Sequence, residues 1–251
     1  MSDLPDLTCC LLTYKDAQWG ALTLLALRDR VNYAGRKRFH VADGGSPDWQ
    51  INIYREILNG LDYGITVSPD LASQLNCCAE NSGEVWFYCL DDFTPMAHID
   101  VTPDVRMLLT YPDAGLVRMG RLAFYECRGA GTGFPHGVFG EMVVSGGLHW
   151  WITDKARTLD PYICAVNAGV MHRRFWDAYG PLPQVAPHRP GEAELVWARQ
   201  YGERPGPSVA LPVRFGENDQ STRWQNLEPI QHLRPLHGED YENGAGRWAA
   251  T

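Results

Sequence analysis

Two adjacent carboxylates, Asp91 and Asp92, directly follow the apolar run at residues 85–90. A continuous apolar run of this length is typical of a strand buried on both faces of a parallel sheet. Ligands of open α/β sheets bind at the carboxyl ends of the strands. Two carboxylates held there repel each other unless a cation lies between them, and a divalent metal on a phosphate-bearing substrate would be such a cation. The simpler alternative is a loop that begins with two aspartates.

Composition favours an ordinary globular protein. The chain has 251 residues, of which 45% are hydrophobic and 21% charged, which suits one large α/β domain or two small ones. The formal net charge of −8 argues against sequence-independent binding of nucleic acid. The seven cysteines have no CxxC or Cys/His metal spacing, so we expect reduced thiols. With neither a signal peptide nor a long apolar run, we expect a cytoplasmic protein without a membrane-inserted segment.

Strand and helix patterns alternate along the first ninety residues. This alternation predicts an α/β fold with a mostly parallel sheet and helices on both faces. The expected strands cover residues 8–13, 38–42, 64–68 and 85–90, and the expected helices cover residues 16–31, 49–58 and 70–78.

The pattern changes after residue 100. We predict one domain with two halves, residues 1–105 and residues 106–236, followed by a loose tail at 237–251. In the second half we expect strands at 116–124 and 148–152, an apolar segment at 162–171, a glycine-rich loop at 128–137, and helices at 173–179 and 192–201.

Three short motifs follow the expected strands in order. The first strand leads into Thr13-Tyr14, the second into the turn V-A-D-G-G-S-P-D at residues 41–48, and the fourth into Asp91-Asp92. Further on stand G-V-M-H-R-R-F at 169–175 and G-E-A-E-L at 191–195, with Arg199 seven residues after Glu192. Together these motifs resemble nucleotide-sugar glycosyltransferases with the GT-A fold, in particular the large inverting group related to cellulose and chitin synthases.

The resemblance implies a Rossmann-like half that binds a nucleoside diphosphate sugar, with UDP as the expected nucleotide, and a second half that binds the acceptor. Asp43 would accept a hydrogen bond from the base, and Thr13 and Tyr14 would line the base and the ribose. Gly44 and Gly45 would let the backbone approach the nucleotide closely. A plain turn is the alternative for the Asp-Gly-Gly sequence.

The resemblance also implies a divalent cation, Mg²⁺ or Mn²⁺, across the donor diphosphate. Asp92, together with Asp91, would hold the cation, since carboxylate oxygens suit these hard ions. A histidine near the C-terminus, His237 or His232, would complete the coordination.

Transfer with inversion needs a general base for the acceptor hydroxyl. By the resemblance this base is Glu192, with Glu194 as the alternative because Ala193 replaces the aspartate of the G-E-D motif. Both glutamates fall in the first turn of an expected helix, where carboxylates are favourable in any case. Arg199 would bind phosphate or pair with one of these carboxylates on its own helix.

Two other functions remain open. A sugar nucleotidyltransferase also has acids at strand ends, but it normally carries a G-x-G-x-R loop where this chain has Thr13-Tyr14-Lys15-Asp16. Ala193 keeps open a non-catalytic module that binds a nucleotide or a glycan. The acceptor is a glycan, a protein or a modified nucleobase, and nucleic acid is expected only in that acceptor role.

Two residue groups have both a functional and a structural reading. Trp150-Trp151 would stack on sugar rings, or at least one of the pair packs in the core. The basic residues near the N-terminus would serve phosphates, or they are solvated ends of secondary structure. They are Lys15, Arg28, Arg30, Arg36, Lys37 and Arg38.

Overall fold

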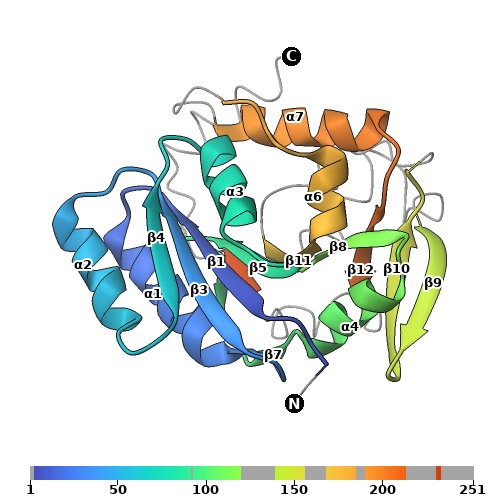
Figure 1. Ribbon diagram of the computed structural model, residues 1–251, viewed down its shortest axis with the longest axis horizontal. Coiled ribbons are helices and arrows are strands. Elements are labelled where there is room, and N and C mark those ends of the chain that lie inside the picture. The colour runs from blue at the N-terminus through green and yellow to red at the C-terminus, as the bar shows by residue number, and fades with distance from the viewer. Residues whose placement is uncertain are drawn as a thin grey trace.

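The architecture is a mixed sheet with helices on both faces, seen in a computed structural model (Figure 1). The structure describes residues 3–91, 93–119, 139–155, 168–184, 190–212 and 230–232. The strands of the main sheet are β1 (Leu7–Thr13), β3 (Lys37–Asp43), β4 (Tyr63–Val67), β5 (Val85–Leu90), β8 (Ala114–Arg118), β9 (Phe139–Ser145), β10 (Leu148–Thr153), β11 (Ala168–His172) and β12 (Ser208–Pro212). The helices are α1 (Ala17–Arg30), α2 (Asp48–Ile57), α3 (Leu71–Glu80), α4 (Thr102–Thr110), α6 (Arg173–Tyr179) and α7 (Pro190–Glu203).

The main sheet has the strand order β4-β3-β1-β5-β11-β8-β12-β10-β9. Its first four strands are parallel, and the chain places β3 and β4 on one side of β1 before it returns to β5 on the other side. The strand order therefore reverses between β1 and β5, which is where open α/β sheets bind ligands. The predicted strands and helices of residues 8–90 are confirmed, with ends that differ by one or two residues.

The second half continues the same sheet with mixed directions. β11 is antiparallel to both β5 and β8, β12 is parallel to β8, and the β9–β10 hairpin closes the far edge. The structure thus confirms the predicted α/β class. It adds α4, β9 and β12, which the sequence pattern did not predict. Two small sheets pair β2 (Val31–Asn32) with β7 (Ile99–Asp100) and β6 (Phe93–Pro95) with β13 (Ile230–His232).

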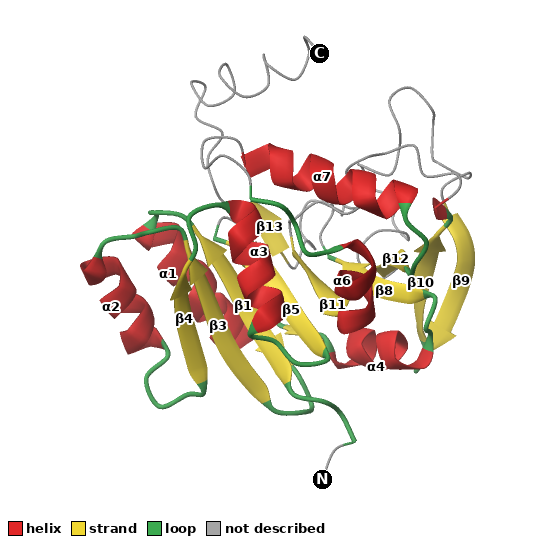
Figure 2. Ribbon diagram, turned by 45° about the horizontal axis from the view of Figure 1, so that its top comes forward, coloured by secondary structure: helices red, strands yellow, loops and turns green. Residues whose placement is uncertain are grey.

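Each face of the main sheet has its own apolar core because strand side chains alternate between faces. On β1, Leu11 belongs to the core with α1, α2 and α4, and its neighbour Leu12 belongs to the core with α3, α6 and α7. Figure 2 shows the second helix layer, in which α7 runs past one end of α3 and over α6. No helix in the described part of the chain is both long enough and apolar enough to cross a lipid bilayer.

The tryptophan pair on β10 divides between core and surface. Trp150 is fully buried, and its indole N–H donates a hydrogen bond of 2.9 Å to Asp104 Oδ1 on α4. Asp104 is itself fully buried. Trp151 is only half-buried. The prediction that at least one of the two packs in the core is therefore confirmed.

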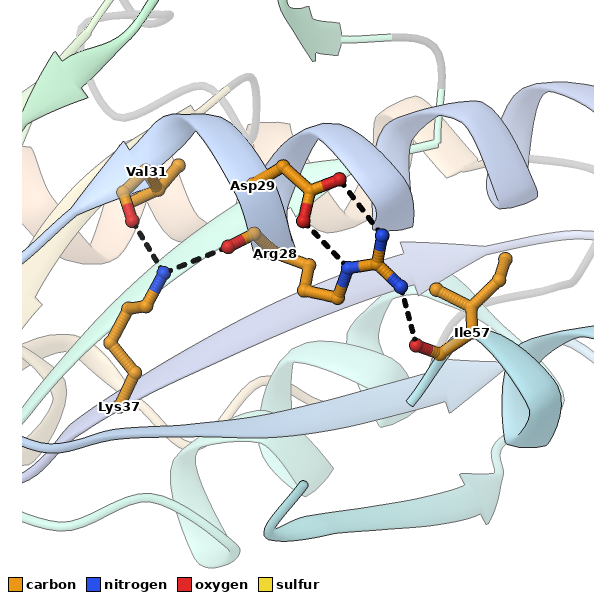
Figure 3. Close-up of polar contacts among 5 residues, drawn as sticks. All are labelled: Arg28, Asp29, Val31, Lys37 and Ile57. Carbon is orange, nitrogen blue, oxygen red and sulfur yellow. Dashed lines mark hydrogen bonds and ion pairs between the residues drawn. The ribbon is translucent and has the colours of Figure 1, made fainter. Parts of the chain in front are cut away.

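Two basic side chains, Arg28 and Lys37, hold the end of α1 (Figure 3). The Lys37 ammonium donates to the carbonyl oxygens of Arg28 at 3.0 Å and Val31 at 2.6 Å. Arg28 pairs with Asp29 and donates to the carbonyl oxygen of Ile57. Because Lys37 begins β3, these contacts lie at the amino edge of the parallel strands, away from the edge at which ligands bind. They favour the structural reading of these residues.

Candidate functional site

Three predicted site residues meet at the carboxyl edge of the sheet, on either side of the point where strand order reverses. Thr13 ends β1 and is paired in register with Asp43, the last residue of β3. On the other side of β1, Leu12 is paired with Leu90, the last residue of β5, so that Asp91 follows level with Thr13. The parallel register therefore brings together the three motifs that follow β1, β3 and β5, which are the first, second and fourth expected strands.

Asp91 is fixed by both its side chain and its backbone. Its Oδ2 accepts hydrogen bonds from the Thr13 hydroxyl at 3.2 Å and from the Tyr14 N–H at 3.0 Å. Its own N–H donates to the Leu12 carbonyl oxygen at 2.9 Å. Its carbonyl oxygen accepts from the Thr23 hydroxyl of α1 at 2.6 Å. Only 6% of Asp91 is exposed, so the carboxylate holds the ends of β1 and β5 together.

Asp43 uses its carboxylate to shape the turn that follows it. Oδ2 accepts from the N–H groups of Gly45 at 2.8 Å and Ser46 at 2.6 Å, and Oδ1 accepts from the Ser46 hydroxyl at 2.5 Å. Asp43 is fully buried, and Gly45 has φ of 86°, a conformation that favours glycine. The geometry thus favours the turn reading of Asp43, because the carboxylate that was expected to meet a base already receives three donors.

Tyr14 covers this turn with an aromatic ring. The Gly44 N–H donates to the Thr13 carbonyl oxygen at 2.8 Å, which holds the turn against the end of β1. A Cβ atom added to Gly44 would lie 2.3 Å from Tyr14 Cδ2, so the ring rests where a side chain would stand. The ring is nevertheless partly open to solvent, since 46% of Tyr14 is exposed, and the Lys15 ammonium lies over it. A partly exposed aromatic ring suits stacking with a nucleobase or a sugar.

Buried polar groups from α2 and α3 support the end of β1. The Tyr54 hydroxyl lies 3.1 Å from the Thr13 hydroxyl and 2.7 Å from the Gln50 side-chain amide. Burial raises the pKa of Tyr54, so its phenol stays neutral and able to donate. The Gln74 amide donates to the Thr13 carbonyl oxygen at 2.9 Å. Nothing in the local sequence pattern links these supporting residues to the site.

The predicted base residues lie on α7. Ala193 is fully buried in the core that α7 shares with α3 and α6, and Trp197 and Tyr201 continue the same buried stripe at intervals of four residues. Glu192 and Glu194, on either side of Ala193, are half-buried. An aspartate at position 193 would place a charge in this core, which is a physical reason for the alanine there. Arg199 is exposed.

Several predicted residues fall outside the described ranges. They include Asp92, His237 and the glycine-rich loop at 128–137. The backbone of His232 in β13 pairs with Phe93 of β6, so this C-terminal strand runs beside the segment that follows Asp91. Within the described residues, no three His, Cys, Asp or Glu side chains come together as a metal-binding cluster.

Comparison with solved structures identifies glycosyltransferases as structural neighbours. No protein-family model matches the chain, and no curated protein matches it. TarS from S. aureus is similar over 82% of this chain and 36% of its own, with a TM-score of 0.54 and 12% identity. TarS 1–349 in complex with UDP is similar over 82% of this chain and 60% of its own, with a TM-score of 0.53 and 13% identity.

A mannosyltransferase from Pyrobaculum calidifontis, PcManGT, solved in complex with GDP-Man and Mn²⁺, has a TM-score of 0.51 and 14% identity. The match covers 82% of this chain and 56% of the PcManGT chain. This chain therefore spans less than two thirds of each of these neighbours. At such low identity the likeness shows the fold alone, which this chain shares with these glycosyltransferases.

Proposed function

We propose that the chain is a metal-dependent glycosyltransferase that moves a sugar from a nucleoside diphosphate sugar, expected to be UDP-linked, to an acceptor hydroxyl with inversion. The observation that carries the proposal is the position of Asp91. Its carboxylate lies where the strand order reverses, bound to Thr13 and Tyr14, in a fold shared with glycosyltransferases. The acceptor is a glycan, a protein or a modified base.

The donor nucleotide would bind above Thr13, Tyr14 and the turn at residues 43–46. The exposed part of the Tyr14 ring offers stacking for the base, and Gly45, which is exposed and has no atom near the position of a Cβ, leaves the turn backbone accessible. In this proposal Asp43 acts through the turn, because its carboxylate is already used by Gly45 and Ser46.

The carboxylates that follow β5 suit a hard divalent cation such as Mn²⁺ or Mg²⁺ in their chemistry. When bound, such an ion stabilises negative charge on the leaving diphosphate. Because Asp91 already holds Thr13 and Tyr14, we assign Asp92 as the main ligand, with His237 as a further candidate. An ion bound by one or two carboxylates and substrate phosphates does not require a larger cluster of protein ligands.

Proton removal from the acceptor is assigned to Glu192, with Glu194 as the alternative. Both stand in the first two turns of α7 and are half-buried. Removing a general base typically lowers turnover by about 10²–10⁴-fold without an equal loss of donor binding. Separate Glu→Gln variants at the two positions therefore identify the base.

A donor screen tests the proposal. Purified protein is incubated with UDP-, GDP-, CMP- and TDP-sugars, with and without Mn²⁺, and free nucleotide is measured. We expect metal-dependent release from one donor, and loss of that release in Asp92→Ala. Failure of the wild-type protein to bind any of these donors overturns the proposal.

A second candidate is a binding module without catalysis, and the buried Ala193 favours it because the motif acid is missing. Such a module would bind a nucleotide sugar without releasing nucleotide. Its donor affinity would be unchanged in both Glu192→Gln and Glu194→Gln. The same screen separates the two candidates when it is combined with a direct binding measurement.

A further inference from the structure

Lys15 has a different position from the other basic residues near the N-terminus. It stands two residues after the end of β1, at the carboxyl edge of the sheet, and its N–H donates to the Ser46 hydroxyl at 3.2 Å. The remaining members of the group stand at the opposite edge, at the end of α1 or the start of β3. They are Arg28, Arg30, Arg36, Lys37 and Arg38.

The backbone of Lys15 has an unfavourable conformation. Its φ is 55°, and among the described residues it is the only one other than glycine with a positive φ. A long side chain gains nothing locally from this left-handed conformation, which costs on the order of 1 kcal/mol. The surrounding contacts impose it, because Ser46 binds the Lys15 N–H and also donates to Asp43. Strain of this kind concentrates at ligand-binding sites.

The Lys15 ammonium lies beside the proposed nucleotide site. It is 5.1 Å from the centre of the Tyr14 ring, and the side chain is exposed. Nearby carboxylates already have other partners, since Asp16 accepts from the Trp19 N–H and Asp43 accepts from its own turn. Within the described part of the chain, the Lys15 ammonium forms no ion pair with a carboxylate.

We infer that Lys15 binds a phosphate group of the donor and makes the site selective for nucleoside diphosphates. This inference rests on the proposed function, and it assigns a residue that the resemblance did not place in the site. A cation beside Tyr14 attracts a nucleoside diphosphate more strongly than a monophosphate, which carries less negative charge, and it contributes little to the binding of an uncharged nucleoside. The attraction weakens as salt screens it.

The inference is tested by calorimetric titration of UDP, UMP and uridine, with the guanosine series in parallel. Lys15→Asn removes the charge but tolerates the left-handed backbone, and Lys15→Arg keeps the charge. Arg55→Gln, an exposed change on α2, serves as the control for net charge. We expect Lys15→Asn to weaken diphosphate binding about tenfold and to leave nucleoside binding unchanged. Lys15→Arg and Arg55→Gln should stay within about twofold of wild type.

Two results overturn the inference while the proposed function stands. One is diphosphate affinity that does not change in Lys15→Asn. The other is an equal loss of nucleoside and diphosphate affinity, which would mean that the residue acts only through the position of Tyr14. If the wild-type protein binds no nucleoside diphosphate of either series, the proposed function fails and this inference fails with it.

Discussion

The hydroxyl of Thr23 on α1 donates a hydrogen bond of 2.6 Å to the carbonyl oxygen of Asp91, although the two residues are 68 positions apart in the sequence. The same hydroxyl lies 2.5 Å from the hydroxyl of Thr94, and Thr23 and Thr94 are both fully buried. This contact joins α1 to the turn that carries the Asp91-Asp92 pair. Asp91 itself and Thr94, which follows the pair, are therefore both held by α1.

Replacement of Thr23 tests this contact. Thr23→Val keeps the shape of the side chain but leaves the buried Asp91 carbonyl oxygen without its donor. We expect a loss of about 1–3 kcal/mol in the free energy of unfolding, measured by urea denaturation. Thr23→Ser retains the hydroxyl and should recover most of that loss. Equal stability of Thr23→Val and wild type would contradict the role of this hydrogen bond.

The glycine pair after Asp43 allows a matched comparison. Gly44→Ala would bring a methyl group within 2.3 Å of Tyr14 Cδ2, so we expect the ring to move and nucleotide affinity to fall by about tenfold or more. Gly45→Ala meets no atom within 4 Å, but its φ of 86° strains an alanine by roughly 1–2 kcal/mol. It should lower the free energy of unfolding instead. Calorimetric titration and urea denaturation of both variants separate the two effects, and an unchanged affinity in Gly44→Ala would argue against the role of Tyr14.

His40 gives stability a defined pH dependence. Burial, helped by the nearby Arg38, lowers the pKa of His40 from 6.5 to about 4. Its ring nitrogen lies 2.9 Å from the Thr66 hydroxyl in a site shared with Cys77. As pH falls from 6.5 toward 4 the unfolded chain takes up a proton that the folded chain does not, so the free energy of unfolding should fall.

Denaturation curves across pH 4–7 measure this contribution. Wild type should lose stability as the pH falls from 6.5 to 4. His40→Gln should reduce the slope of the free energy of unfolding against pH, by at most the amount that corresponds to uptake of about one proton. Parallel slopes for the two proteins would show that other groups control the acid response.

The Asp104–Trp150 pair anchors α4 to the second half of the sheet. Both side chains are fully buried, and one hydrogen bond of 2.9 Å joins them. We expect a double-mutant cycle of Asp104→Ala and Trp150→Phe to give a coupling energy of about 1–3 kcal/mol. Additive effects on the free energy of unfolding would show that the two residues act independently.

The sequence predicted the parallel half of the fold because its strands are continuous apolar runs separated by clear turn signals. It also predicted that Thr13, Asp43 and Asp91 meet, since the carboxyl ends of parallel strands share one edge. It left open whether Asp43 binds the base or shapes a turn, and in the structure the Asp43 carboxylate bonds within the turn. An aspartate that binds a ligand and an aspartate that caps a turn have the same local pattern.

The supporting contacts could not be predicted for another reason. Thr23, Tyr54 and Gln74 reach the site across 41 to 68 positions of sequence, and each sits within an ordinary helix pattern. Only the packing of α1, α2 and α3 on the sheet brings them to the ends of β1 and β5. The role of Ala193 likewise became clear only from its burial against α3 and α6.

The most direct test of the central claim is hydrogen–deuterium exchange of the protein with and without UDP or GDP in the presence of Mn²⁺. The proposed site predicts slower exchange in peptides that contain Tyr14, Gly44 and Asp91, and no change in the β9–β10 hairpin. The same nucleotide should give no protection in Asp91→Ala at equal concentration. Protection confined to other segments, or none with any nucleotide, would contradict the assignment of a nucleotide-sugar site at the β1–β5 edge.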